Sequence, residues 1–317
     1  MSDEKKATMK AVRIHTYGGP EVLLYEDVAR PRAAAGEVLL RVYAAGVNPA
    51  DWKTRSGPAR PGAILPMILG WDVSGVVEAL GPEVTEFHEG DAVYGMIRFP
   101  RSGATYAEYV AAPVAHLAHK PATIDHIHAA AVPLAGLTAW QALFEKAHLT
   151  AGQTVLILGA AGGVGHLAVQ LAKSQRAYVF GTASTRNIEF LHRIGVDQAI
   201  DYTTTPLETA VHNVDVVFDT VGGETREHSL RVIKPGGMLV SILLGRSSLE
   251  QAVADFNVQG MLVQPNAVQL AQIAQLIDAG KVHITVDTVL PLANARKAHE
   301  LSETHRTRGK IVLRVAE

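Results

Sequence analysis

The first third of the chain alternates short apolar runs with turn-forming residues. The runs are rich in β-branched and aliphatic residues, and Gly or Pro separates them at short intervals, which is typical of β-strands joined by tight turns. Such runs cover residues 9–14, 37–47, 75–80, 91–94 and 108–112. We therefore expect a compact antiparallel barrel or sandwich in this part of the chain.

From residue 154 onwards, apolar strands alternate with amphipathic helices, after a stretch of helical spacing around 124–146. Strands are expected at 155–158, 178–181, 199–201, 215–218, 238–242 and 258–263, and helices at 164–174, 187–194 and 224–232. This alternation indicates βαβ units in a doubly wound parallel sheet. Two helices, near 268–279 and 293–304, and two strands, near 285–290 and 310–315, follow it and could close the first domain.

Composition excludes several classes of function. The 317 residues fit about two domains. A net charge of -2, without a long run of one sign, argues against a nucleic-acid partner. The chain has no cysteine, which excludes disulfides, thiolate metal sites, iron–sulfur clusters and cysteine nucleophiles. No apolar stretch is long enough to span a membrane, so we expect a soluble, cytoplasmic protein.

The strongest functional motif is the glycine-rich turn at 159–165, which lies between a predicted strand and a predicted helix. Its glycines permit a tight turn and a close approach to a pyrophosphate, and the free N–H groups at the helix start face the anion. We therefore predict a dinucleotide site, the alternative being a purely structural turn. Its predicted contacts are Gly159, Ala161, Gly162, Gly163 and Val164.

The residues after the second strand of this region indicate which dinucleotide binds. NAD sites usually carry an acid at this position, whereas this chain has Ser184 and Arg186. A guanidinium and a hydroxyl can both bond to a 2′-phosphate, so we predict NADPH. Tyr202, after the third strand, is a further candidate contact near the adenosine phosphate. The alternatives are a helix cap at Ser184, a solvated first turn at Arg186 and an ordinary surface tyrosine.

Two more turns, at 219–223 and 243–245, follow the fourth and fifth strands. In a doubly wound sheet these strand ends flank the cofactor crevice. Val221 and Leu243 are therefore candidate cofactor contacts, and ordinary strand-to-helix turns are the alternative.

The order of the elements and five motifs together resemble the medium-chain dehydrogenase/reductase superfamily, specifically its zinc-free quinone oxidoreductase and enone reductase branch. The resemblance covers nearly the whole chain, and its motifs lie at 45–51, 69–77, 135–139, 159–165 and 308–313. It implies an α/β protein with two domains. A β-rich GroES-like catalytic domain would comprise 1–131, completed by 267–317, and a Rossmann-type NADPH domain would comprise 132–266.

The resemblance also implies a reaction without zinc. Zinc alcohol dehydrogenases of the superfamily carry a catalytic Cys and a Gly-His-Glu segment, whereas this chain has Asn48 and the segment 70–72, Gly-Trp-Asp. Four histidines are clustered in sequence, but without an acid at zincin spacing they are more typical of surface or loop positions than of a metal site. They are His116, His119, His126 and His128.

The implied reaction is hydride transfer from NADPH to a quinone or an α,β-unsaturated carbonyl. Negative charge then develops on the carbonyl oxygen and must be met by hydrogen-bond donors and a proton. Asn48 is a family position beside the nicotinamide, Lys53 matches a lysine of plant-type enone reductases, and Thr138 is a family position next to the nicotinamide amide. Lys310, in the last motif, is a further candidate cofactor contact. Asp51 either orients Lys53 or is its plain ion-pair partner.

Several alternatives remain open at this stage. Tyr94 and Tyr106 flank a predicted loop, and either hydroxyl could donate the proton. The chain could instead be a non-catalytic NADPH-binding protein, crystallin-like or RNA-binding, or an enoyl-thioester reductase whose carrier would meet basic side chains. Those side chains are Arg55, Arg60, Arg98 and Arg101. The family commonly forms homodimers through edge strands of the cofactor domain, and the run 258–263 is suitably apolar.

Overall fold

The computed structural model describes residues 8–57, 64–243 and 257–316. The chain divides into two compact units. The first comprises Met1–Leu134, Gln264–Asp278 and Val286–Glu317, and the second comprises Ala135–Val263 and Ala279–Thr285. Of the positions considered above, Arg60 and residues 244–245 lie outside the described residues.

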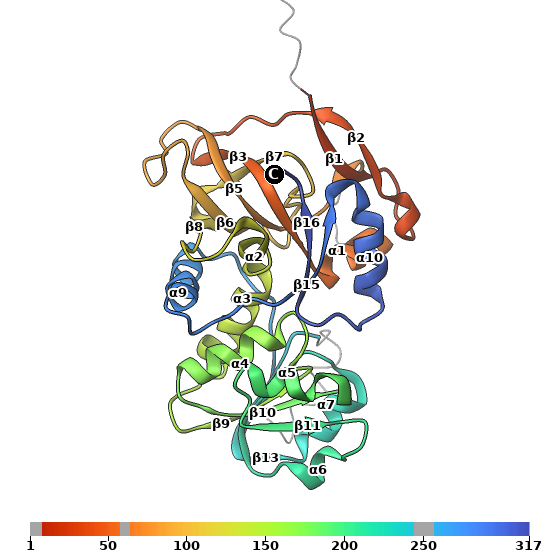
Figure 1. Cartoon of the computed structure of the whole chain (residues 1–317), viewed down its shortest axis with the longest axis vertical. Helices are drawn as coiled ribbons and strands as arrows, with labels where there is room; N and C mark the ends of the chain where they lie inside the picture. Colours follow the sequence, from red (N-terminus) through yellow and green to blue (C-terminus); the bar gives the residue numbers. More distant parts are fainter. Residues whose placement is uncertain (1–7, 58–63, 244–256, 317) are drawn as a thin grey trace, which may run out of the picture. The chain divides into compact units, whose positions relative to one another are not determined.

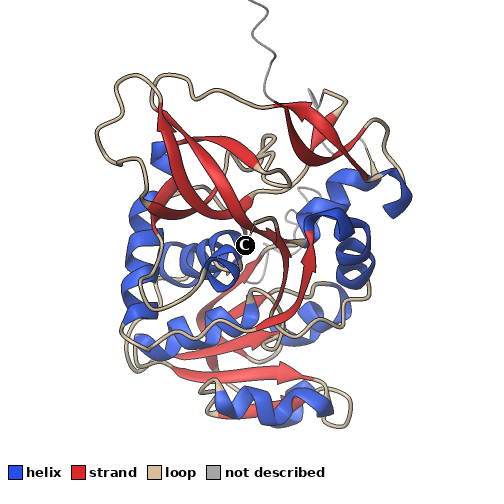
Figure 2. Ribbon diagram, turned by 45° about the horizontal axis from the view of Figure 1, so that its top comes forward, coloured by secondary structure: helices blue, strands red, loops and turns tan. Residues whose placement is uncertain are grey.

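The first unit is built on two β-sheets, drawn in red in Figure 2. The larger has the order β15-β16-β3-β5-β6-β8, with β7 also pairing with β3, and the smaller has the order β2-β1-β4. The larger sheet contains β3 (Glu37–Val47), β5 (Asp72–Leu80), β6 (Ala92–Met96), β7 (Tyr109–Pro113), β8 (Leu117–His119), β15 (Val286–Pro291) and β16 (Lys310–Arg314). The smaller contains β1 (Thr8–Ile14), β2 (Leu24–Ala29) and β4 (Met67–Ile68).

Strand direction in this unit differs from the expectation at one place. The other pairs are antiparallel as predicted, but β15 and β16 run parallel. A helix, α10 (Ala295–Glu303), connects them, and such a crossover is what joins parallel neighbours. Through β16 the C-terminal segment pairs with β3 and so extends the larger sheet of the N-terminal part.

Short helices complete the first unit. They are η1 (Pro20–Val22), α1 (Pro49–Ser56), η2 (Val114–His116), α2 (His126–Ala130), α9 (Ala267–Asp278) and η5 (Leu292–Asn294). One apolar core packs α10 against three strands, through Val12, Val47, Ala298 and Leu313. Because α10 carries its small and apolar residues on one face, that face is buried, whereas Arg296 and Lys297 are exposed.

The second unit has a single six-stranded sheet of order β11-β10-β9-β12-β13-β14, with all five pairs parallel. Numbered within the unit, this is the order 3-2-1-4-5-6 of a doubly wound dinucleotide-binding sheet, as predicted (Figure 1). The strands are β9 (Thr154–Leu158), β10 (Tyr178–Ala183), β11 (Gln198–Asp201), β12 (Val214–Asp219), β13 (Ile233–Ser241) and β14 (Asn257–Gly260). Strands buried on both faces need continuous apolar runs, and Leu156, Val217, Leu239 and Val258 supply the core.

Helices cover this sheet and connect its strands. They are α4 (Gly165–Ser174), η4 (Thr185–Asn187), α5 (Ile188–Arg193), α6 (Leu207–Ala210) and α7 (Gly223–Leu230). The single helical stretch expected around 124–146 is three segments, namely α2, α3 (Pro133–Trp140) and the π-helical η3 (Gln141–Lys146). Pro133 separates the first two, because proline is accommodated at the start of a helix but not in its interior. In the described part of the chain, no helix combines the length and apolarity that crossing a membrane requires.

Candidate active site

The carboxyl ends of the parallel strands in the second unit gather the predicted cofactor residues. In a sheet whose strands all run the same way, these ends lie along one edge. The glycine turn follows β9, Ser184 and Arg186 follow β10, and Tyr202 follows β11. Val221 follows β12 and Leu243 follows β13. The structure therefore brings residues from five separate turns to one edge of the sheet.

The glycine turn is shaped to bind an anion. Gly159 has φ +72°, which favours glycine, and its N–H donates to Oγ1 of Thr182 at 3.1 Å. A Cβ on Gly165 would lie 2.2 Å from the carbonyl oxygen of Gly159, so only glycine permits this close packing. Within the described residues, no hydrogen bond to another protein group is formed by the N–H groups of Ala161, Gly163 and Val164. Free N–H groups at the start of a ten-residue helix fit the pyrophosphate of a dinucleotide.

The turn after β10 leaves polar groups accessible. Ser184 is half-buried and its side chain caps no helix, while Arg186 and Tyr202 are exposed. A carboxylate that the sequence reasoning did not consider, Asp201, lies at the end of β11 beside this turn. Hydrogen bonds from Thr185 and Thr203 occupy it and hold its pKa below the usual value.

Asp219 organises the two remaining turns and was missed by the sequence analysis. It is fully buried; Oδ1 accepts the N–H groups of Val221 at 2.9 Å and Gly222 at 2.7 Å, and Oδ2 accepts the Ser241 hydroxyl at 2.7 Å. The Ser241 oxygen in turn accepts the N–H of Leu243 at 3.2 Å. One carboxylate thereby fixes two turns whose apolar side chains, Val221 and Leu243, are 48% and 39% exposed. An Asp that ends a buried strand immediately before a glycine-containing turn is the signal that could have identified it.

The first unit contributes a buried polar cluster around Asn48, which precedes α1. The Nδ2 atom of Asn48 donates to Asp72 at 2.9 Å, and Oδ1 accepts from the ammonium of Lys310. Lysine only donates and a carboxylate only accepts, so these partners fix the orientation of the Asn48 amide. The Lys310 ammonium also lies 3.0 Å from the carbonyl oxygen of Val47 and 3.5 Å from Asp72. Its three hydrogens are therefore matched by three acceptors in this unit.

Asp51 and Lys53 do not form the pair that was expected. Asp51 is fully buried and accepts the N–H of Asn48 at 2.6 Å, whereas Lys53 is exposed and its ammonium lies 5.5 Å from the ring centroid of Trp52. Residues two positions apart on a helix point to opposite faces. The expected ion pair, and with it the orientation of Lys53 by Asp51, is therefore wrong.

Burial changes the acidity of both carboxyls in this cluster. Desolvation raises the pKa of Asp51 to about 7, with a smaller raising effect from Asp72. Desolvation also raises the pKa of Asp72, although the charge of Lys310 opposes it. A carboxyl with a pKa of about 7 changes charge near neutral pH.

The two tyrosines considered as proton donors are both fully buried. The Tyr94 hydroxyl donates to the carbonyl oxygen of Leu270 at 2.6 Å, and burial raises its pKa far above the ordinary value. The Tyr106 hydroxyl lies 3.3 Å from Nε2 of His299 and is close to Asp51. Only Tyr106 therefore reaches the Asn48 cluster. Thr138, the remaining predicted contact, is buried in α3.

The four clustered histidines have separate environments. His116 accepts the N–H of Arg98 at 2.9 Å, and His119 packs edge-on against Phe87. His126 stacks on Tyr43 and lies 2.8 Å from the Ser74 hydroxyl, while His128 pairs with Asp125. Among the described residues, no group of three or more His, Asp or Glu is placed to hold a metal ion.

Comparison with known proteins matches both units. Residues 34–122 match the model of the alcohol dehydrogenase GroES-like domain, and residues 194–313 match that of the zinc-binding dehydrogenases. The chain is 37% identical to the 2-methylene-furan-3-one reductase of Solanum lycopersicum, covering 96% of this chain and 79% of the relative. It is also 37% identical to the chloroplastic NADPH-dependent alkenal/one oxidoreductase of Arabidopsis thaliana, with the same coverage.

A solved structure agrees over the full length. The quinone oxidoreductase from Coxiella burnetii superimposes with a TM-score of 0.92 at 37% identity, covering 98% of this chain and 100% of that one. The similarity therefore includes both units and the segments that connect them in sequence.

Proposed function

Since the chain belongs to the medium-chain dehydrogenase/reductase superfamily, we propose that it is an NADPH-dependent, metal-free oxidoreductase that transfers hydride to quinones or α,β-unsaturated carbonyls. The observation that carries this function is its full-length similarity to reductases of enones, alkenals and quinones. Residues 1–131 with 267–317 are proposed as the catalytic domain, and 132–266 as the cofactor domain.

NADPH, when bound, supplies the hydride, and the residues at the carboxyl edge of the second unit would hold it. The free N–H groups of the glycine turn suit its pyrophosphate. Ser184 and Arg186 are proposed to bind the 2′-phosphate, and Tyr202 to lie near the adenosine. The side chains of Val221 and Leu243 are proposed to contact the nicotinamide, with Thr138 beside its amide.

Asn48 and Lys53 are proposed as the catalytic residues that meet the substrate oxygen. The Asn48 amide is held by Lys310 and Asp72, so one of its two Nδ2 hydrogens remains for the carbonyl oxygen on which charge develops. The exposed ammonium of Lys53 supplies a positive charge to the same oxygen. Asp51 and Lys310 act through Asn48, so we assign them as positioning residues rather than direct contacts.

A mechanism without a metal is proposed from the side chains available as ligands. The chain has no cysteine, and the described histidines and carboxylates form no group that could bind a metal ion. Asn48 stands near the position at which zinc alcohol dehydrogenases of the superfamily carry a catalytic Cys, and a neutral amide does not replace a thiolate ligand. Polarisation of the substrate is therefore assigned to hydrogen bonds and the Lys53 charge.

The test is the initial rate of NADPH and of NADH oxidation, followed by absorbance, with one para-quinone and one simple enone as acceptors. The assay is run with and without a metal chelator. We expect turnover that favours NADPH and does not change with the chelator, and the faster acceptor identifies the substrate class. Loss of activity on chelation would contradict the metal-free mechanism, and NADPH binding without turnover of either acceptor would contradict the assigned reaction.

A homodimer and a cytoplasmic location are also proposed. The apolar run at 258–263 overlaps β14, which among the described strands lies at the edge of the second unit's sheet. An edge strand of this kind can pair with a second copy. Cell fractionation with an antibody against the chain tests the location, and enrichment in an organelle would refute it.

A further inference from the structure

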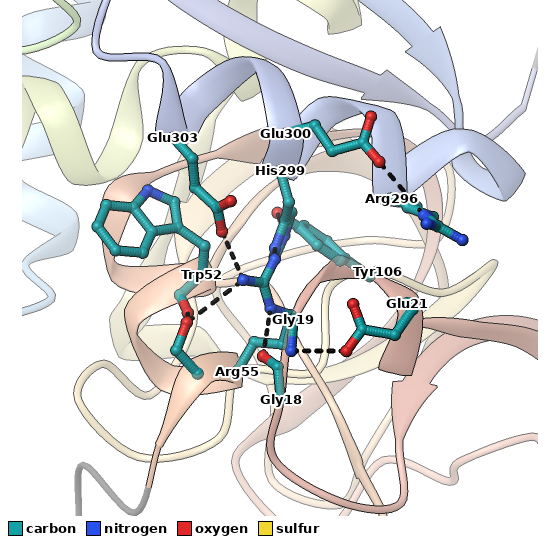
Figure 3. Close-up of polar contacts among 11 residues, drawn as sticks. Gly18, Gly19, Glu21, Trp52, Arg55, Tyr106, Arg296, His299, Glu300 and Glu303 are labelled. Carbon is teal, nitrogen blue, oxygen red and sulfur yellow. Dashed lines mark hydrogen bonds and ion pairs between the residues drawn. The ribbon is translucent and has the colours of Figure 1, made fainter.

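A series of buried polar side chains in the first unit leads to Asp51. It contains Arg55 from α1, His299 from α10 and Tyr106 from the segment between β6 and β7, and the partly exposed Glu303 of α10 pairs with Arg55 (Figure 3). Arg55, Tyr106 and His299 are at most 2% exposed, although all three carry polar groups. Polar groups are rarely buried this deeply without partners, so their hydrogen bonds show how they are used.

Arg55 determines which atoms donate and which accept in the hydrogen bonds around it. Its guanidinium pairs with Glu303, donates from Nε to the carbonyl oxygen of Gly18 at 3.1 Å, and places Nη1 3.3 Å from Nδ1 of His299. Arginine has no acceptor and stays protonated, so Nδ1 of His299 must accept. Burial and then the Arg55 charge lower the pKa of His299 to about 3, so its ring is neutral. A neutral ring that accepts at Nδ1 carries its hydrogen on Nε2.

That hydrogen points to Tyr106. Nε2 of His299 lies 3.3 Å from the Tyr106 hydroxyl, so the hydroxyl oxygen accepts and its own hydrogen is free for another group. The buried Asp51 carboxyl has an open oxygen that can accept this hydrogen, and the Tyr106 side chain opposes the larger rise in the Asp51 pKa caused by burial. Among the described residues, Oδ1 of Asp51 is buried without a hydrogen-bond partner, so it is an open acceptor for a hydroxyl hydrogen.

We propose that Arg55, His299 and Tyr106 form a chain of hydrogen bonds that all point toward Asp51, which makes Tyr106 and His299 positioning residues that set when Asp51 is charged. Permanent protonation of Arg55 gives the chain its direction. Reversing it would need an acceptor on the guanidinium, which does not exist.

Four groups face the Asp51 carboxyl. The negative charge of Asp72 favours the protonated form, whereas the Asn48 N–H, the Lys310 ammonium and the Tyr106 hydroxyl favour the charged form. Asn48 and Lys310 hold their positions through bonds to each other and to Asp72. Of these four contributions to the Asp51 pKa, only that of Tyr106 depends on the hydrogen bonds to His299 and Arg55. Variants that change those hydrogen bonds therefore isolate the Tyr106 contribution.

The charge on Asp51 has a consequence at the proposed catalytic amide. A charged carboxylate accepts the Asn48 N–H more strongly than a neutral carboxyl does, and this bond is 2.6 Å long. The chain of hydrogen bonds through Tyr106 therefore controls how firmly Asn48 is held near neutral pH. This link to turnover rests on the proposed function, whereas the titration of Asp51 does not.

The first experiment measures the Asp51 pKa directly. The carboxyl carbon of Asp51, identified by the loss of its signal in Asp51→Asn, is followed by NMR from about pH 5 to about pH 9. In Tyr106→Phe the pKa should rise by about one unit, because a hydrogen bond to the charged form is lost. Tyr94→Phe is the matched control, since it also removes a buried tyrosine hydroxyl, one that donates to Leu270. An unchanged Asp51 pKa in Tyr106→Phe, or an equal rise in Tyr94→Phe, overturns the proposal.

Two variants of His299 test the direction of the chain. Glutamine can accept from Arg55 with its carbonyl and donate to Tyr106 with its amide, whereas leucine can do neither. His299→Leu should raise the Asp51 pKa by less than Tyr106→Phe does, because the Tyr106 hydroxyl stays but loses the bond that orients it, and His299→Gln should restore the native value. Equal pKa values in the two variants would mean that the direction of the hydrogen bonds does not matter, and the proposal would be wrong.

The pH dependence of kcat/KM separates this proposal from the proposed function. The acid-side fall in activity should move to higher pH in Tyr106→Phe and His299→Leu, in step with the Asp51 titration. If no quinone or enone is reduced, the proposed function fails, while the NMR titration of Asp51 still tests the chain of hydrogen bonds. If the enzyme turns over and the Asp51 pKa is the same in the variants, the chain of hydrogen bonds is refuted and the proposed function stands.

Discussion

Replacing Asp51 by asparagine should make the first unit more stable than the native protein as pH rises. In the folded protein burial raises the Asp51 pKa from 3.8 to about 7, so the carboxyl is neutral where the unfolded chain is already charged. A group with a raised pKa contributes stability fully below its unfolded value, and the contribution is lost as pH rises to the folded value. Each pKa unit corresponds to about 1.4 kcal/mol, so the free energy of unfolding falls by about 3 kcal/mol between about pH 5 and about pH 8. Asparagine has no such dependence.

The assay must report on the first unit alone, because the two units need not unfold together. The chain has three tryptophans, and Trp52 and Trp71 belong to the first unit, whereas Trp140 belongs to the second. In a Trp140→Phe background, fluorescence during urea unfolding therefore reports on the surroundings of α1. The free energy of unfolding is measured with and without Asp51→Asn at several pH values.

The quantity to compare is the difference in free energy of unfolding between the two proteins, because the contributions of the other titrating groups cancel in this difference. We expect this difference to shift in favour of Asp51→Asn by about 3 kcal/mol from about pH 5 to about pH 8. Glu89→Gln, which removes an exposed carboxylate, is the control, and its difference should change with pH less than that of the buried Asp51. A flat difference for Asp51→Asn, or one that shifts the opposite way, would refute the assignment of a raised pKa to Asp51.

Three further predictions concern the cofactor and the assembly. Arg186→Ala should raise KM for NADPH on the order of tenfold with little effect on NADH, because a charge-assisted bond to the 2′-phosphate is lost, and equal effects on both would exclude that role. Gly165→Ala should weaken NADPH binding about tenfold, measured by fluorescence titration, because its Cβ would lie 2.2 Å from the Gly159 oxygen and displace the turn. Gly57→Ala, which meets no atom within 4 Å, is the control and should bind normally. Light scattering should give twice the 33.8 kDa chain mass, and a monomer at all concentrations would rule out the homodimer.

The succession of elements could be predicted because it depends on local patterns. Continuous apolar runs and helical spacing marked every strand of the second unit and most of its helices, since strands buried on both faces leave little choice of residue. Elements with little burial were missed. The strand β2 alternates exposed and half-buried residues, and the helix α6 spans only Leu207–Ala210 with no buried side chain.

The glycine turn could also be recognised from sequence, because its chemistry resides in the backbone and requires glycines at fixed spacing. The turns at Val221 and Leu243 were placed by the same topological rule. What holds those two turns together was not visible, since Asp219 bonds to Ser241 on the neighbouring strand β13. Such a contact depends on which strands lie side by side, and many sequences with an Asp at a strand end lack it.

Neighbouring residues and composition are enough to predict the order of strands and helices, the glycine turn for a dinucleotide and the lack of thiolate ligands. The surroundings of Asp51, in contrast, depend on how distant segments pack. The tertiary structure buries this carboxyl on the face of α1 opposite Lys53, joins Asn48 to Lys310 across 262 positions, and brings Arg55 to His299 across 244. Burial and long-range partners set the proton affinity of an acid, and neither is encoded in the residues next to it.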